Sequence, residues 1–196
     1  MRDKWYADNR DLIKWSGIIH LCLTRRIKTA IQIPYYRSEE WPAMVFDDEE
    51  IPLSPPVIEH FRDIRDIKRL SERIDLEIVV FQEYFDPSHR VKYHNDVCAK
   101  LHGIKGKKVV FVDPDKGLAI QKYAAEHVKP NEVREIWRSL NLGDILVFYQ
   151  HRFRNKDWLK LRRNQLSDIC GVEVSRVRTW LAQQIAHDVA FYYIEK

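Results

Sequence analysis

The sequence predicts a three-layer α/β/α domain built on a mostly parallel sheet, and three observations lead to this fold class. Short, mainly apolar runs at 76–81, 108–112 and 145–149, in which Glu77 and Lys108 are the only charged residues, are typical of strands buried on both faces. Charged, amphipathic stretches separate these runs, as crossover helices separate parallel strands. Two final runs, at 174–180 and 188–194, are expected to form strands antiparallel to each other.

The other elements follow in order along the chain. A helix is predicted over 8–27, with Asp8 as its cap and Arg25 and Arg26 at its carboxyl end, and a strand over 30–35. Residues 38–56 hold four prolines and an acidic block at 47–50, which predicts a long loop or lid. Helices are predicted over 57–74, 93–101, 132–140 and 158–169, so residues 1–196 read as one domain.

Composition limits the class of protein. The chain has 196 residues, of which 45% are hydrophobic and 32% charged, with 6 Gly and 3 Cys, and this excludes a disordered tail, a collagen-like repeat and a disulfide-stapled miniprotein. The cysteines are far apart, which suits a reducing compartment. The amino-terminal residues are polar and no apolar run approaches ~18 residues, so we expect a cytoplasmic protein without a membrane partner.

Polar residues follow each predicted strand at the edge where an open α/β sheet binds its ligands. Asp113 is the most informative, because it ends the most apolar strand and Pro114 fixes the turn after it. Its carboxylate could activate water, orient an amine or hold a metal; alternatively, it could form an Asx-turn helped by Gly117. Gln150 and His151 could contact a base edge or transfer a proton, or could bond to neighbouring loops.

A basic segment follows the last of these positions. Residues 152–163 hold six basic residues and one acidic residue, with Phe153 and Trp158 between them. This density of cations is what contact with a nucleic-acid backbone requires, although a solvated helix face over a buried Trp158 gives the same pattern. The predicted nucleic-acid contacts are Arg152, Arg154, Lys156, Lys160, Arg162 and Arg163.

Two other kinds of site have little support in the sequence. Asp86, His89 and His94 match no tetrahedral metal signature, and we expect a solvated loop there rather than a metal site. The glycine-rich phosphate-binding motifs are missing, and Tyr35 and Tyr36 follow the first strand instead. We therefore predict no metal and no cofactor.

The segment from Tyr6 to Trp15, with its Asp-x-x-Lys pair Asp11 and Lys14, resembles the opening of the large-subunit ribosomal RNA adenine-N6 methyltransferases. In that family a strand-end acidic residue followed by Pro-Pro and an aromatic residue grips the adenine amine, and Asp113 with Pro114 lies at the matching place. The resemblance implies that Asp11 and Lys14 face the site and that Asp113 lies nearest the base.

This sequence departs from the family in two places. The family has a glycine-rich loop after the first strand to hold S-adenosylmethionine, whereas this chain has residues 35–38. Asp115 replaces the second proline and Lys116 the aromatic residue. The resemblance therefore implies a methyltransferase-like scaffold whose cofactor pocket is lost or repurposed.

Without a methyl donor, water is the remaining reactant, so we predict a hydrolase of the DNA-glycosylase type that removes a flipped, possibly modified base. The predicted catalytic residues are Asp113, Asp115, Lys14 and Asp11. The predicted substrate contacts are Tyr6, Asp8, Tyr35, Tyr36, Arg37, Gln150 and His151, with Trp41 as a further stacking residue.

Three alternatives stay open. A metal-dependent nuclease would use Glu83, Asp86, Asp113 and Asp115 around Mg²⁺. A nucleic-acid-binding module without catalysis would keep the basic segment alone, and a residual methyltransferase would bind S-adenosylmethionine. DNA is favoured over RNA as the partner, while the base, the pathway and the oligomeric state are left undetermined.

Overall fold

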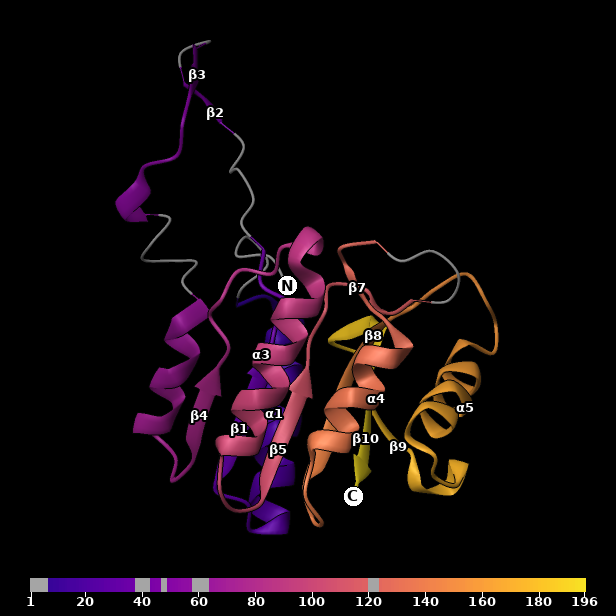
Figure 1. Ribbon diagram of the computed structural model, residues 1–196. Helices are drawn as coiled ribbons and strands as arrows, with labels where there is room; N and C mark the ends of the chain where they lie inside the picture. Colours follow the sequence, from indigo (N-terminus) through magenta and orange to yellow (C-terminus); the bar gives the residue numbers. More distant parts are fainter. Residues whose placement is uncertain (1–6, 38–42, 47–48, 58–63, 120–123) are drawn as a thin grey trace.

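The computed structural model describes residues 7–37, 43–46, 49–57, 64–119 and 124–196, and a six-stranded sheet forms its centre (Figure 1). The strands lie in the order β4 (Glu77–Val80), β1 (Thr29–Ile33), β5 (Lys108–Val112), β8 (Ile145–His151), β10 (Ala186–Glu195) and β9 (Arg178–Ala182). The first four strands are parallel, and β10 is antiparallel to both of its neighbours. The predicted sheet, with its antiparallel carboxyl-terminal pair, is confirmed.

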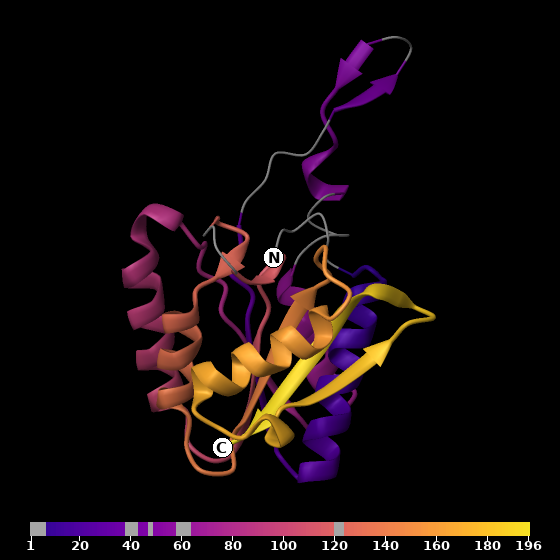
Figure 2. The same cartoon turned by 90° about the vertical axis from the view of Figure 1, so that its right-hand side faces the viewer.

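Helices cover both faces of this sheet (Figure 2). Helix α1 (Asn9–Arg25) packs on β1, β5 and β10, and the 3-10 helix η2 (Ile64–Glu72) packs beside it on β4. Helices α3 (Arg90–Gly103), α4 (Pro130–Ser139) and α5 (Trp158–Cys170) cover the other face. Alternate residues of β5 enter the two cores, with Val109 toward α1 and Val110 toward α4, so the fold has the three predicted layers.

Three predicted elements need correction. Within the predicted helix over 57–74, residues 64–72 form a 3-10 helix, because Ile64, Ile67 and Leu70 recur every three residues. The predicted loop over 38–56 contains a hairpin of β2 (Met44–Phe46) and β3 (Glu49–Ile51), which projects beyond the sheet in both ribbon views (Figures 1 and 2). The run at 174–180 begins with a 3-10 turn, η4 (Val174–Arg176), before β9.

Three short elements have no counterpart in the sequence prediction. They are the 3-10 turn η3 (Pro87–His89) and the two-residue strands β6 (Gly117–Leu118) and β7 (His127–Val128), which pair in parallel. Elements of two or three residues are too short to show a hydrophobic period. In the described part of the chain, none of the helices has the length and apolar character needed to cross a membrane.

Candidate functional site

The order of the strands places a switch point between β1 and β5. The chain leaves β1 toward β4 at one side and returns past β1 to β5, from which it continues to β8 at the other side. Open α/β sheets bind ligands outside the carboxyl ends of the strands at such a point. Asp113 directly follows β5, and its backbone N–H donates to the carbonyl of Ile33 at the end of β1 (2.9 Å). The residue singled out from the sequence therefore lies at the switch point.

A buried cluster of ionisable groups surrounds Asp113. Lys14 Nζ lies 3.0 Å from Asp113 Oδ1 and 3.0 Å from Asp11 Oδ1, and Gln32 Nε2 donates to Asp113 Oδ2 (2.9 Å). Lys14 and Asp11 lie one turn apart on α1, which explains how the Asp-x-x-Lys pair reaches the strand end together. Lys14 Nζ also lies 4.8 Å from the ring centre of Tyr149. The structure thus brings together Asp11, Lys14 and Asp113, three of the four residues predicted to be catalytic.

The cluster has more acid than base. Burial alone would lower the pKa of Lys14, but Asp11 and Asp113 raise it well above its usual value, so this ammonium stays charged. Burial raises the pKa of Asp113, and Lys14 only partly opposes that shift. Two carboxyl groups share one ammonium, so the cluster favours a hydrogen-bond donor or a cation over an anion.

The expectation that Asp113 projects into an open groove needs correction. Only 1% of its surface is exposed, and Lys14 and Gln32 take up its carboxylate. A carboxylate in this setting has no access to bulk water. Asp113 can position a group that reaches it, but it is poorly placed to orient a hydrolytic water.

The turn after β1 differs from the prediction. Tyr35 has a left-handed backbone (φ 48°), although only 1% of it is exposed and its side chain packs in the α3 core. Its hydroxyl lies 2.7 Å from His94 Nε2, so His94 is buried, whereas we expected it in a solvated loop. Tyr36 is buried too and stacks on Tyr84 (5.0 Å). Neither tyrosine is open to an extruded base.

Asp115 and Arg37 meet across the switch point. Arg37 Nη2 pairs with Asp115 Oδ2, which joins the segment after β1 to the loop after β5. Burial alone would raise the pKa of Asp115, but nearby positive charge, including that of Arg37, holds it below its usual value. Asp115 is thus an ionised carboxylate at this edge, and 14% of its side chain is exposed.

Gln150 holds the loop after β5 in place. Its Oε1 accepts from the backbone of Leu118 (3.0 Å), and its Nε2 donates to the carbonyls of Lys116 (2.9 Å) and His151 (2.7 Å). Gly117 has φ 96°, and a Cβ there would lie 2.4 Å from Gln150 Oε1. The predicted contact of Gln150 with a base edge is therefore corrected, because this amide already bonds to backbone.

His151 takes part in a second polar cluster, next to the first. Its Nε2 lies 3.1 Å from Asp188, which also accepts from Arg10 Nη2 (2.5 Å). Arg10 and His151 hold the pKa of Asp188 below its usual value, although burial opposes them. Asp8 caps α1 by accepting from the backbone N–H groups of Arg10 (2.8 Å) and Asp11 (3.0 Å), so its predicted role as a substrate contact is better described as structural.

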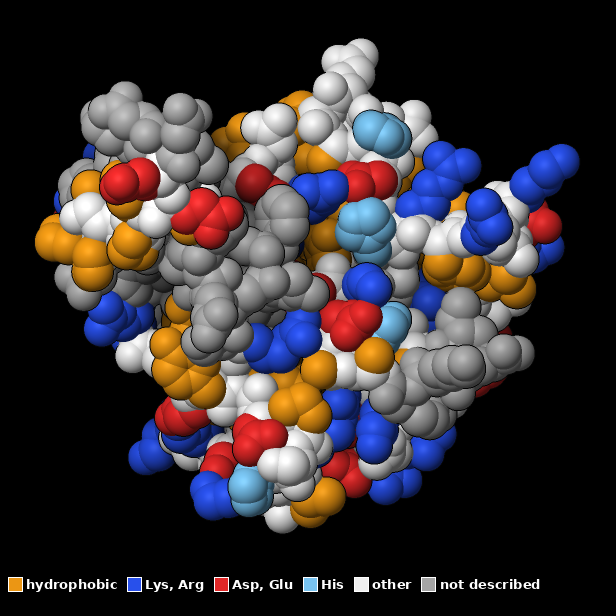
Figure 3. All heavy atoms as spheres, turned by 90° about the horizontal axis from the view of Figure 1, so that it is seen from above, with side chains coloured by type: hydrophobic (Ala, Val, Ile, Leu, Met, Phe, Trp, Pro, Cys, Tyr) orange, Lys and Arg blue, Asp and Glu red, His pale blue; other side chains and the backbone are white. Residues whose placement is uncertain are grey.

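An open, cationic cavity adjoins His151. It has a volume of about 560 Å³ and is lined by His151, Arg152, Phe153, Arg154, Asn155, Lys156 and Asp188. Arg152, Arg154 and Lys156, three of the predicted nucleic-acid contacts, are exposed. Seen from above, the carboxyl edge shows acidic, basic and histidine side chains close together, with further basic side chains along its rim (Figure 3).

The basic segment does not form one continuous face. Lys160 and Arg163 are exposed on α5, but only 1% of Arg162 is exposed. Its guanidinium lies 5.0 Å from the Phe153 ring centre, and burial lowers its pKa to about 10. Trp158 is buried in the core. The predicted phosphate contact of Arg162 is therefore corrected, because its helical position turns it inward.

The acidic residues of the nuclease alternative are dispersed. Glu83 pairs with Lys100, and Asp86 caps η3 by accepting from Ser88 (2.8 Å). In the described ranges, no three His, Cys, Asp or Glu side chains are arranged to hold a metal ion. Tyr6 and Trp41 lie outside the described residues.

Sequence reasoning missed Gln32, Arg10, Asp188 and Tyr149 as members of these clusters. Gln32 left a signal, since it is a polar residue inside an otherwise apolar strand. The sequence gives no signal for Asp188, because only the fold brings β10 beside α1.

Comparison with known proteins gives no relative. The chain matches no family model, no curated protein and no solved structure.

Proposed function

We propose that this protein recognises a nucleic-acid base at the β1–β5 switch point and acts on it there, with the adjoining β8–α5 loop binding the backbone. The observation that carries the proposal is the pairing of two neighbouring sites of opposite character. The Asp11–Lys14–Asp113 cluster favours a donor such as an exocyclic amine, and the cavity beside His151 carries three exposed cations.

The two sites are linked through side chains that belong to both. Lys14 lies over the Tyr149 ring, which is on β8 two residues before His151. Arg10 lies on the same helix as Lys14 and pairs with Asp188, the partner of His151. A nucleotide that places its phosphate against Arg152, Arg154 and Lys156 would therefore have its base directed along this edge.

The hydrolytic reaction expected from the sequence has less support than base recognition. Glycosidic hydrolysis needs a carboxylate that water can reach, and Asp113 is closed off. Asp115 is the more accessible of the two and keeps its charge, so it is the carboxylate to which we assign any hydrolytic step. Group transfer to a base amine, as the methyltransferase resemblance implies, would instead use Asp113 to hold the amine.

The binding part of the proposal is tested with fluorescently labelled single- and double-stranded oligonucleotides at several salt concentrations. We expect Arg152→Gln/Arg154→Gln/Lys156→Gln to make the slope of log K against log salt less negative by about 2–3, since each of the three phosphate contacts contributes about 0.7–0.9. The matched control, Lys105→Gln/Lys107→Gln/Arg138→Gln, removes the same charge from three exposed residues distant from the cavity. Equal effects of the two triple variants would contradict a specific backbone site.

The reaction is tested by mass spectrometry of the same oligonucleotides after incubation, with and without S-adenosylmethionine. Loss of a base that requires Asp115 indicates hydrolysis, and gain of a methyl group that requires Asp113 indicates transfer. Unchanged oligonucleotides under both conditions would overturn the catalytic part and leave a binding protein.

A further inference from the structure

A second cavity lies on the α1 side of the sheet, between α1 and η2. Its volume is about 560 Å³, within the range of ~300–1,000 Å³ that is usual for small-molecule sites. Its apolar wall is formed by Leu12, Trp15, Ile19, Ile67 and Leu70. Asp11 lines one end, so the cavity adjoins the switch-point cluster without being part of the edge that carries the basic loop.

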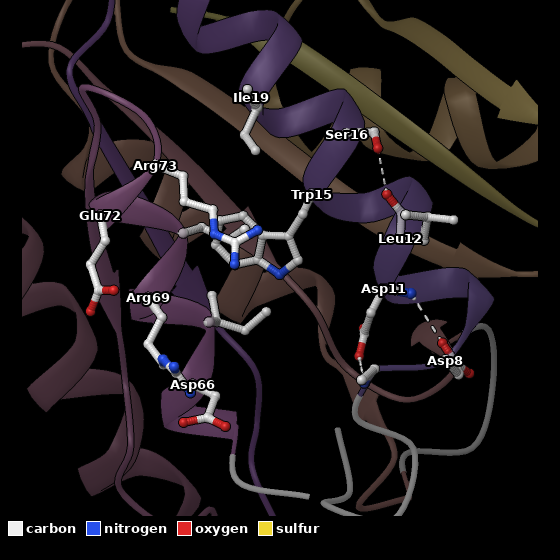
Figure 4. Close-up of a pocket in the computed structure, with 13 residues that line it drawn as sticks. Asp8, Asp11, Leu12, Trp15, Ser16, Ile19, Asp66, Arg69, Glu72 and Arg73 are labelled. Atoms are coloured by element: carbon white, nitrogen blue, oxygen red, sulfur yellow. Dashed lines mark hydrogen bonds between the residues drawn. The ribbon is translucent and has the colours of Figure 1, made fainter. Parts of the chain in front are cut away.

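The strongest sign of a ligand here is the indole nitrogen of Trp15. Only 5% of Trp15 is exposed, and its Nε1 donor has no acceptor in the part of the chain that the structure describes. Figure 4 shows this nitrogen directed toward the space between Asp11 and η2. A buried donor without an acceptor is costly, roughly 1–3 kcal/mol, and a ligand that accepts from it would remove that cost.

The charged side chains around the cavity define the other part of the ligand. Arg69 and Arg73 line the cavity, and so does Asp66, which lies beside Arg69 in Figure 4. Among the described residues neither arginine has a salt-bridge partner, and Arg73 is the one of the two that lies toward Trp15. Arg73 extends from η2 toward Trp15, and Glu72 points away (Figure 4). The carboxylates at the α1 end are already engaged, Asp8 as the helix cap and Asp11 with Lys14.

We propose that this cavity binds a small organic carboxylate with an apolar body. The carboxylate accepts from Trp15 Nε1 and from the Arg73 guanidinium, which together supply directed donors and a positive charge. The apolar body lies along Leu12, Ile67 and Leu70. This site adjoins the proposed nucleic-acid site at Asp11, but the groups that bind the ligand are different ones, so its test does not depend on that function.

The test uses protein labelled with ¹⁵N-tryptophan and two probes of the same shape, 4-phenylbutanoate and 4-phenylbutan-1-ol. We expect 4-phenylbutanoate to shift the Trp15 Nε1–H signal saturably and to bind about tenfold more tightly than the alcohol. Trp15→Phe assigns the signal. If Trp15→Phe does not fold, the assignment comes from Arg73→Gln without ligand. Because Arg73 extends toward Trp15, the indole signal whose position differs from that in the unmodified protein is assigned to Trp15.

Arg73→Gln should weaken 4-phenylbutanoate binding about tenfold and leave binding of the alcohol unchanged. Arg178→Gln, which removes an exposed arginine from β9, should change the binding of neither 4-phenylbutanoate nor the alcohol. The proposal is overturned if no tryptophan signal shifts saturably, if the acid and the alcohol bind equally, or if Arg178→Gln has the effect expected of Arg73→Gln.

Discussion

Lys14 and Asp113 are the residues on which the proposed site depends most, and their burial makes their pairing measurable. We expect Lys14→Met to lower the free energy of unfolding by about 3–5 kcal/mol, because it leaves two buried carboxyl groups without their cation. The double variant with Asp113→Asn should lose less than the sum of the two single changes, with a coupling of about 1 kcal/mol or more. Urea unfolding of the four proteins measures this.

A matched control for that cycle is available on α3. Lys92 and Asp96 form an ion pair with similar chemistry (2.7 Å), but both side chains are largely exposed. Their coupling should stay below about 0.5 kcal/mol. The claim that Lys14 and Asp113 form a buried ion pair would be contradicted by either of two results. One is that the effects of Lys14→Met and Asp113→Asn on stability simply add; the other is that the coupling is equal in the Lys14–Asp113 and Lys92–Asp96 cycles.

Gly117 gives a second test at the scale of single residues. Gly117→Ala should destabilise the protein by about 1–3 kcal/mol, because φ is positive there and the new Cβ would meet Gln150 Oε1 at 2.4 Å. Gly103→Ala is the control, since a Cβ at Gly103 meets nothing within 4 Å. Thermal unfolding of both variants suffices, and a neutral Gly117→Ala would mean that Gln150 does not hold this loop.

At the scale of elements, a buried ionic network joins α3 to α4. Arg90 on α3 pairs with Glu132 at the start of α4, and His94 Nε2 lies 3.5 Å from Glu132. Burial would raise the pKa of Glu132, but hydrogen bonds from His94 and Arg90 outweigh it and lower the pKa to about 2. The ionised form therefore stabilises the fold above the usual glutamate pKa, and this contribution is lost as the pH falls from about 4.5 toward 2.

Glu132→Gln should therefore destabilise the protein in a pH-dependent way. We expect a loss of about 3 kcal/mol in the free energy of unfolding at pH 7, where Arg90 loses its buried partner. The difference in the free energy of unfolding between Glu132→Gln and the unmodified protein should become steadily smaller below pH 4. Urea unfolding of both proteins at pH 7 and pH 3 measures this difference. A difference of equal size at both pH values would show that the charge of the Glu132 carboxylate is not what joins α3 to α4.

The elements that could be predicted from sequence are those with a strong hydrophobic period. Four of the five residues at 108–112 are apolar, all five are buried, and β5 has these bounds in the structure. The sequence predicts a helix over 57–74 but not its type. An apolar residue at every third position fits an α-helix and a 3-10 helix equally over so short a segment, and residues 64–72 form the 3-10 helix η2. The hairpin of β2 and β3 was missed because prolines and acidic residues flank its three-residue strands.

At the scale of the whole molecule, strand-end positions could be predicted, but the direction in which their side chains point could not. The location of Asp113 at the carboxyl end of β5, at the switch point, follows from the sheet rule. Tyr35 turns inward because its backbone is left-handed, and Arg162 turns inward because of its position around helix α5. The sequence predicts a base contact for Gln150, but its amide bonds to backbone groups of Lys116 and Leu118, which lie far from it in the sequence, and of the adjacent His151.

The central claim is that a nucleic-acid base lies at the β1–β5 switch point. Photocross-linking with oligonucleotides that carry a photoreactive base, followed by peptide mass spectrometry, tests it most directly. We predict cross-links to the accessible residues at this point, Arg37, Asp115 and Lys116. These cross-links should compete away with unlabelled oligonucleotide and weaken in Arg152→Gln/Arg154→Gln/Lys156→Gln. Cross-links confined to the opposite edge of the sheet, at residues 104–107 and 141–144, would contradict the account.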